Sequence, residues 1–195
     1  MIVTDLASLN CTAVILAGGA ANRFGGVNKG LQRLGKFTLV EHVANAFPQT
    51  WPIVLSTHDN SEKFKHIGFE CIDDKHDEYA GPMKAITDIA GSISTAYLAV
   101  SPCDTPFINQ SVYQQLSDQR ETAAYAVNHG REHYCCFMAR VDAITTLEEE
   151  PRSMRHLLAM LNASPVLIEE PARTFTNINS QQDLLKAEQS LQQQQ

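Results

Sequence analysis

The sequence lacks the long apolar runs, secretion signal and basic excess that mark three large classes of protein. No apolar run approaches the roughly 18 residues that a membrane-spanning helix requires, so we expect no membrane partner. The N-terminus carries no Lys or Arg before its first apolar run at positions 13–17, which is wrong for a secretory signal, and we expect a cytoplasmic protein. The formal net charge of −7 argues against a nucleic-acid partner.

Paired cysteine motifs are also missing. The chain has five cysteines, but none stands at C-x-x-C spacing, and no histidine lies at zinc-finger spacing from them. A structural zinc site is therefore not expected. An odd number of cysteines without a secretory signal fits reduced, mostly buried thiols.

Acidic residues are absent from one long segment. The chain contains 22 Asp and Glu residues, yet none lies between Asp5 and Glu41. The same segment holds Arg23 and Lys29 among glycines at positions 18, 19, 25, 26 and 30. Glycines let successive backbone N–H groups turn toward an anion, and nearby cations offset its charge, so the segment predicts an anion site. A chance gap on a solvated loop is the alternative.

Alternating strand and helix patterns run along the whole chain. Short apolar runs predict strands, and apolar residues at helical spacing predict helices between them. We expect strands at about 12–16, 53–55, 70–72, 96–101, 123–128, 133–139 and 166–168, and helices at about 38–46, 62–66, 81–89, 110–117, 141–149, 153–161 and from 180 onward. This order predicts an α/β fold: a single doubly wound, mostly parallel sheet with helices on both faces. The hairpin at 123–139 makes the sheet mixed, and residues 1–195 are expected to form one domain.

Three features lie at the ends of predicted strands, where open α/β sheets bind their ligands. They are the segment 16–19, Asp74 and Asp104. The glycine segment is not a dinucleotide fingerprint, because G-x-G-x-x-G is absent. It is not a Walker A loop either, because Gly30-x4-Gly35-Lys36 is followed by Phe37 rather than Ser or Thr.

The segment 16–31 reads LAGGAANRFGGVNKGL and resembles the L-A-G-G-x-x-x-R-M/F-G-x-x-K signature of the small nucleotidyltransferases. Within them it is most similar to the molybdenum cofactor guanylyltransferases, whose version continues as G-G-x-D-K-G-L. Further matches follow in the same order: Gly81-Pro82, then SPCDTPF at 101–107, and NINS at 177–180 with Asp183-Leu184. The resemblance therefore spans nearly the whole chain and implies a Rossmann-like nucleotidyltransferase fold.

The resemblance implies a role for each matching residue. The segment Leu16, Ala17, Gly18 and Gly19 would hold the nucleotide. Lys29 would contact phosphate, with Arg23 sharing that work. Asp74 and Ser56 would belong to the GTP site, and Asp104 would bind GTP-linked Mg²⁺. Asn177 and Asn179, with the C-terminal half of the chain, would face the pterin acceptor.

The implied reaction transfers GMP from GTP to the phosphate of molybdenum-molybdopterin and releases pyrophosphate. Two anions must approach each other, so the barrier is largely electrostatic, and Lys29, Arg23 and Asp104 are the expected catalytic groups. Transient contact with molybdoenzyme apoproteins or cofactor-delivery proteins is also implied.

Four departures from the family pattern bear on these expectations. Asn28 stands where aspartate is usual, Ser56 where asparagine is typical, Lys84 where a small residue is commoner, and Tyr134 where proline is frequent. Two alternatives therefore stay open. One is a related enzyme that uses CTP or a sugar or polyol phosphate acceptor, and the other is a non-catalytic nucleotide-binding cofactor-delivery protein.

Structural roles compete with the functional ones at several positions. Asp104 could simply cap the helix that follows it, and Lys29 could be a solvated loop lysine. Asp74 shares its surroundings with Asp73, and asparagines such as Asn177 and Asn179 also favour turns.

Overall fold

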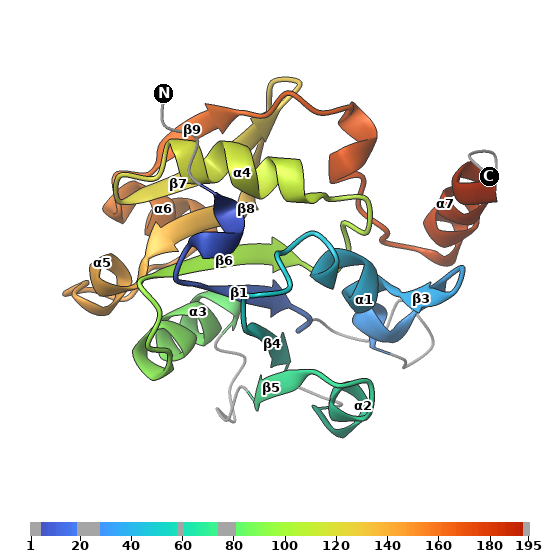
Figure 1. The fold of residues 1–195 in the computed structure, drawn as a ribbon, viewed down its shortest axis with the longest axis horizontal. Helices are drawn as coiled ribbons and strands as arrows, with labels where there is room; N and C mark the ends of the chain where they lie inside the picture. Colours follow the sequence, from blue (N-terminus) through green and yellow to red (C-terminus); the bar gives the residue numbers. More distant parts are fainter. Residues whose placement is uncertain (1–4, 19–27, 58–60, 74–80, 193–195) are drawn as a thin grey trace.

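The computed structural model describes residues 5–18, 28–57, 61–73 and 81–192. Their main feature is a seven-stranded sheet (Figure 1). Its strands are β1 (Cys11–Leu16), β4 (Ile53–Thr57), β5 (Glu70–Asp73), β6 (Tyr97–Pro102), β7 (Ala123–Asn128), β8 (Arg131–Arg140) and β9 (Ser164–Leu167), in the order β5-β4-β1-β6-β8-β7-β9. Within this sheet only β8 runs against the other strands. The predicted mostly parallel, mixed sheet is confirmed.

Helices cover both faces of the sheet. The α-helices are α1 (Leu39–Ala44), α2 (Ser61–His66), α3 (Gly81–Ser92), α4 (Gln110–Asp118), α5 (Val141–Thr145), α6 (Met154–Met160) and α7 (Gln181–Gln192). One apolar layer joins α1, α2 and α4 to the sheet, and a second joins α3, α5 and α6 to the other face. Every residue of β1 is buried, as expected for a central strand that is covered on both sides.

Three short 3₁₀ helices and a small hairpin complete the described structure: η1 (Leu6–Ser8), η3 (Lys29–Leu31), η4 (Ala172–Phe175), and the pair β2 (Arg33–Leu34) with β3 (Phe37–Thr38). Gly35, in the turn between β2 and β3, has a φ of 63°, a left-handed conformation that glycine adopts at no steric cost. Helix α7 packs beside this hairpin (Figure 1), with Leu184 and Ala187 in a small apolar cluster with Leu34.

The chain changes direction across the sheet at β1. From β1 it runs outward through β4 to β5, and it then returns to place β6 on the other side of β1. The ends of β1 and β6 are in register, with Leu16 opposite Pro102, and the Cys103 N–H donates to Leu16 O at 3.0 Å. Open α/β sheets bind their ligands at such a switch point.

The predicted β7–β8 hairpin is present, with a feature that the sequence did not indicate. Its turn residues His129 and Gly130 have φ values of 48° and 75°, as two-residue hairpin turns require. Further along, the β8 partner changes from Phe137, opposite Tyr125, to His133, opposite Ala126. This bulge lies in the part of β8 that continues beyond its pairing with β6.

Several boundaries differ from the predicted ones; α3, for example, continues to Ser92 rather than ending at about residue 89. The helix expected at 141–149 ends at Thr145, where the Thr146 N–H and hydroxyl both donate to Asp142 O, at 3.1 Å and 2.8 Å. The strand expected at 166–168 occupies Ser164–Leu167, where Pro165 is tolerated because β9 is an edge strand. None of the helices in the described ranges has the length and apolar character that crossing a membrane requires.

Candidate active site

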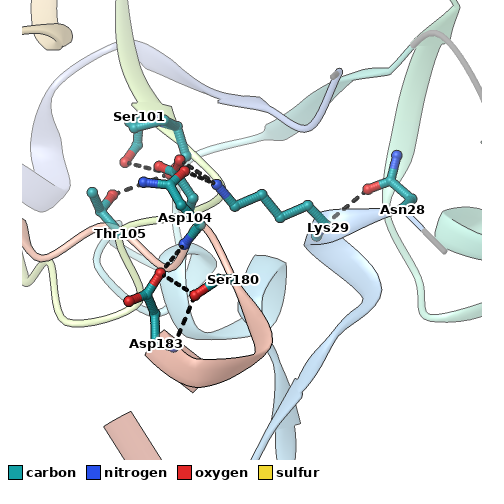
Figure 2. A network of polar contacts seen from close by, with 10 residues as sticks. Asn28, Lys29, Ser101, Asp104, Thr105, Ser180 and Asp183 are labelled. Atoms are coloured by element: carbon teal, nitrogen blue, oxygen red, sulfur yellow. Dashed lines mark hydrogen bonds and ion pairs between the residues drawn. The ribbon is translucent and has the colours of Figure 1, made fainter. Parts of the chain in front are cut away.

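Lys29 lies at the centre of a polar network beside the switch point (Figure 2). It opens the short helix η3, and its side chain points toward the end of β6. The Lys29 Nζ donates to Asp104 Oδ2 and to Asn179 Oδ1, both at 2.7 Å. These partners are 75 and 150 positions away in the sequence, so the fold brings three distant segments to one point.

Asp104 is held just beyond the carboxyl end of β6. Its side chain is 17% exposed, against 24% for the side chain of Lys29. Oδ2 accepts the lysine, whereas Oδ1 is buried and accepts no hydrogen bond from the described residues. A buried carboxylate oxygen without a donor is costly unless a cation or a donor reaches it. Asp104 therefore has one oxygen in use and one still to be satisfied.

Asn179 reaches Lys29 from the extended segment that follows η4. The Ile178 N–H donates to Asp104 O at 2.8 Å, and the fully buried Ile178 side chain fixes this segment. Asp183, in the first turn of α7, accepts from the Asn179 N–H at 3.0 Å and from the Ser180 hydroxyl at 2.8 Å. Ser180 caps α7, since the Asp183 N–H donates to the Ser180 hydroxyl oxygen at 3.2 Å.

The thiols near Asp104 add no charge to this network. Burial raises the pKa of Cys103 to about 12, and the neighbouring Asp104 charge adds to the effect. Burial and the same carboxylate raise the pKa of Cys135 to about 11. Both thiols are therefore neutral near pH 7, and the expectation of reduced cysteines agrees with five free cysteines in the structure.

Asp104 could hold a divalent cation together with a ligand that brings its own oxygens. The described residues contain no group of three or more His, Cys, Asp or Glu side chains arranged to hold a metal ion. Mg²⁺, however, is commonly bound by one or two carboxylates plus substrate phosphates and water. The unsatisfied Asp104 Oδ1 fits such a site.

The other residues with an expected role in the site differ in where they lie. Leu16 and Ala17 are buried at the end of β1, and Gly18 beyond them is exposed. Ser56 is only 5% exposed, and its carbonyl accepts the Ala17 N–H at 2.8 Å, whereas Asn177 is exposed before Ile178. Gly19, Arg23 and Asp74 lie outside the described residues.

The departures from the family pattern have specific contacts. Asn28 is 3% exposed, and its side chain bonds the backbone of Ala17 and Gly30. Lys84 Nζ lies 2.7 Å from Asp88 Oδ1 along α3. The Tyr134 hydroxyl donates to Glu132, and its ring lies 5.5 Å from that of Tyr125. From the sequence, Asn28 stands out only as a departure from the usual aspartate, although asparagine directly before a helical turn is a typical N-cap.

Comparison with known proteins points to one family. The model of the MobA-like NTP transferase domain matches residues 13–166. A molybdenum cofactor guanylyltransferase of Haemophilus influenzae is 32% identical over 193 residues, with 92% of this chain and 98% of that protein covered. One from Yersinia pestis is 30% identical over 181 residues, with 89% and 93% covered.

The fold agrees with a solved structure. The molybdopterin-guanine dinucleotide biosynthesis protein A of Archaeoglobus fulgidus superposes with a TM-score of 0.72 at 21% identity, covering 93% of this chain and 99% of that one. At this identity the likeness shows the fold alone.

Proposed function

The chain belongs to the MobA-like NTP transferase family, and from this premise we propose that it transfers GMP from GTP to the phosphate of molybdenum-molybdopterin. The products are the guanine dinucleotide form of the cofactor and pyrophosphate. One observation carries the proposal: the Lys29 Nζ lies 2.7 Å from Asp104 Oδ2 at the switch point of the sheet. At this place the cation can bind the phosphates of a nucleotide, and the carboxylate can bind the metal ion that accompanies them.

The nucleotide side of the site is built around the end of β1. The proposed nucleotide contacts here are Leu16, Ala17, Gly18 and Gly19. The Ala17 N–H and carbonyl already bond Ser56 O and Asn28, whereas Gly18 is exposed. An ammonium group has three N–H donors, and Lys29 uses two of them on Asp104 and Asn179. The third is directed to phosphate. Arg23, Ser56 and Asp74 complete this proposed nucleotide site.

In the reaction, an oxygen of the acceptor phosphate attacks the α-phosphorus of GTP. A new oxygen–phosphorus bond forms, and the bond from the α-phosphorus to the bridging oxygen breaks, so pyrophosphate leaves. The acceptor phosphate is already ionised near pH 7, because the second pKa of such a phosphate is about 6. No protein nucleophile is needed. Lys29 and Arg23 stabilise the charge on the departing pyrophosphate.

Asp104 is the residue that would hold Mg²⁺. When bound there, Mg²⁺ supplies charge neutralisation and orientation of the phosphate oxygens. Asp104 Oδ1 is the oxygen that fits this role, since it is buried and accepts no hydrogen bond within the described part of the chain. Asp104 Oδ2 keeps Lys29 in place beside it.

The acceptor side of the site is formed by the C-terminal half. Asn179 contacts Lys29 through its side-chain oxygen, so its amide N–H groups can donate to an anionic acceptor. Asn177 is exposed on the same segment and is the second proposed acceptor contact. Transient docking of molybdoenzyme apoproteins or cofactor-delivery proteins, in the cytoplasm, is part of the same proposal.

A direct assay separates this function from its alternatives. The protein is given Mg²⁺, molybdenum-molybdopterin and one of GTP, CTP, ATP or UTP, and pyrophosphate release is measured. We expect release with GTP. Release only with CTP would indicate a cytidylyltransferase. GTP binding without release would indicate either a non-catalytic delivery protein or an enzyme with another acceptor, and a repeat of the assay with a sugar or polyol phosphate separates these two. A nucleotide at about 100 times its Kd should raise stability by about 2.7 kcal/mol in all of these cases.

A further inference from the structure

Asn28 joins two parts of the candidate active site that are distant in sequence. Its side-chain Nδ2 donates to Ala17 O at 3.1 Å, and its Oδ1 accepts the Gly30 N–H at 2.9 Å. Ala17 follows the last residue of β1, and Gly30 lies in η3, the turn that begins with Lys29. With 3% of its surface exposed, Asn28 uses both ends of its amide inside the protein.

Two hydrogen bonds hold the backbone of Ala17. Its N–H donates to Ser56 O at 2.8 Å, which attaches it to β4, and its carbonyl accepts Asn28. Ala17 is therefore held in place by the sheet. Because the Asn28 amide bonds both Ala17 and Gly30, it fixes where η3 lies relative to the sheet. Lys29 is the next residue along the chain, so its Cα position follows from this pair of bonds.

The packing around Gly30 shows that this connection is close-fitted. A Cβ atom added at Gly30 would lie 3.3 Å from the Phe64 ring and 3.4 Å from Asn28 Oδ1. The fully buried Phe64 ring leaves little room on one side, and Asn28 occupies the other. A side chain at Gly30 would therefore press on the Phe64 ring beside the bond to Asn28.

We propose that Asn28 is a positioning residue for the transfer reaction that acts through Lys29. This inference rests on the proposed function. Asn28 bonds backbone groups on both sides of Lys29, and the ammonium must reach Asp104 Oδ2 and Asn179 Oδ1 together. A shift of η3 by a fraction of an ångström moves the third N–H of Lys29 away from the phosphate that it serves.

Asn128 supplies a matched control. It is also 3% exposed, and its Nδ2 also donates to backbone carbonyls, those of Ile168 at 3.0 Å and Glu170 at 2.8 Å. Asn28→Ala and Asn128→Ala both remove a buried amide, so both should lower the melting temperature. We expect only Asn28→Ala to lower kcat, by about 10- to 100-fold, since small misplacement of a reacting group has effects of this size. Equal kcat for the two variants and wild type would overturn the inference.

A double-mutant cycle tests the route through Lys29. Two quantities are measured: turnover, and the rise in melting temperature on adding GTP. In a Lys29→Ala background, Asn28→Ala should lower neither quantity much further, because the lysine side chain that Asn28 positions is already gone. Losses that simply add would contradict the inference. Asn28→Asp keeps an acceptor for the Gly30 N–H and loses the donor to Ala17 O, so its kcat should fall between those of wild type and Asn28→Ala. A kcat at or below that of Asn28→Ala would count against the Gly30 bond.

The proposed function and the inference fail in different ways. If wild-type protein releases no pyrophosphate with any nucleotide, the proposed transfer reaction is wrong, while the coupling of Asn28 to Lys29 can still be measured by GTP binding. If wild-type protein is active and Asn28→Ala matches it in kcat, the inference alone is wrong.

Discussion

Lys29 Nζ lies 2.7 Å from Asp104 Oδ2, although the two residues are 75 positions apart in the sequence. Both side chains are mostly shielded, at 24% and 17% exposure. The pairing gives the carboxylate a cation, and it places the lysine beside the oxygen that can take a metal ion. The first two predictions separate the contributions of these two residues.

Replacing Asp104 by Asn removes its charge and keeps its shape. The amide oxygen can still accept from Lys29, so we expect a melting temperature near that of wild type. Pyrophosphate release should fall by about 10²- to 10³-fold, the size seen when one charge-stabilising group is lost from an active site. Steady-state turnover against Mg²⁺ concentration checks this. Unchanged turnover at every Mg²⁺ concentration would exclude Asp104 from the reaction.

Replacing Lys29 by Met removes the ammonium and keeps much of the apolar stem. We expect turnover to fall by about 100-fold or more, because a charge-assisted contact to phosphate is lost. The loss of stability should be about 1–3 kcal/mol, because neither oxygen of the mostly shielded Asp104 carboxylate would then accept a hydrogen bond from the described residues. Lys65→Met is the matched control: Lys65 also pairs with an acid, Glu62 at 3.0 Å, on the surface of α2. Equal turnover for the two variants would remove Lys29 from the site.

Replacing Gly30 by Ala should affect stability and nucleotide binding together. The added Cβ would lie 3.3 Å from the Phe64 ring and 3.4 Å from Asn28 Oδ1. The contact with Phe64 is tighter than most Cβ contacts and the one with Asn28 is ordinary, so the ring must move by a few tenths of an ångström. We expect a loss of about 1 kcal/mol, the lower end of what overpacking costs. We also expect a higher KM for GTP, because η3 carries Lys29. Gly91→Ala, at a helical glycine with open space around it, should show neither loss. A normal KM for GTP in Gly30→Ala would indicate that η3 tolerates the shift.

Much of the fold could be predicted because its signals are local. Buried strands such as β1 and β6 read as short apolar runs that end in glycine or proline, and helices such as α4 show apolar residues at helical spacing. The order of these elements fixes the class of sheet. The bulge in β8 was not predicted, because it depends on pairing with β7 rather than on the composition of either strand.

The candidate site was predicted only in part. Lys29 and Asp104 stand in recognisable motifs, but nothing local shows that their side chains meet, since this contact depends on how β1 and β6 are paired. The Asn179 contact with Lys29 is another case, because it spans 150 positions. At Asn28 the sequence shows the departure from the usual aspartate. It does not show the bonds of the Asn28 side chain to Ala17 and Gly30.

Replacing His133 by Phe should change how stability depends on pH. The His133 ring stacks on Phe175, with 4.1 Å between ring centroids and 23° between planes. Burial lowers the pKa of His133 from 6.5 to about 4, and the positive charge of Arg131 adds to this shift. Between these pH values the unfolded chain binds a proton that the folded chain does not. The His133 contribution to stability is therefore full above pH 6.5 and is lost as pH falls toward 4.

Phenylalanine keeps an aromatic ring against Phe175 and cannot titrate. The His133→Phe variant should therefore lose less stability than wild type between pH 6.5 and 4, and the two curves should run parallel above pH 6.5. Denaturant unfolding at a series of pH values checks this, since the midpoint and slope give the free energy at each pH. Identical slopes of stability against pH in the acid range would mean that His133 takes up its proton as easily in the folded chain as in the unfolded one. The contact with Phe175 would then not keep this ring neutral.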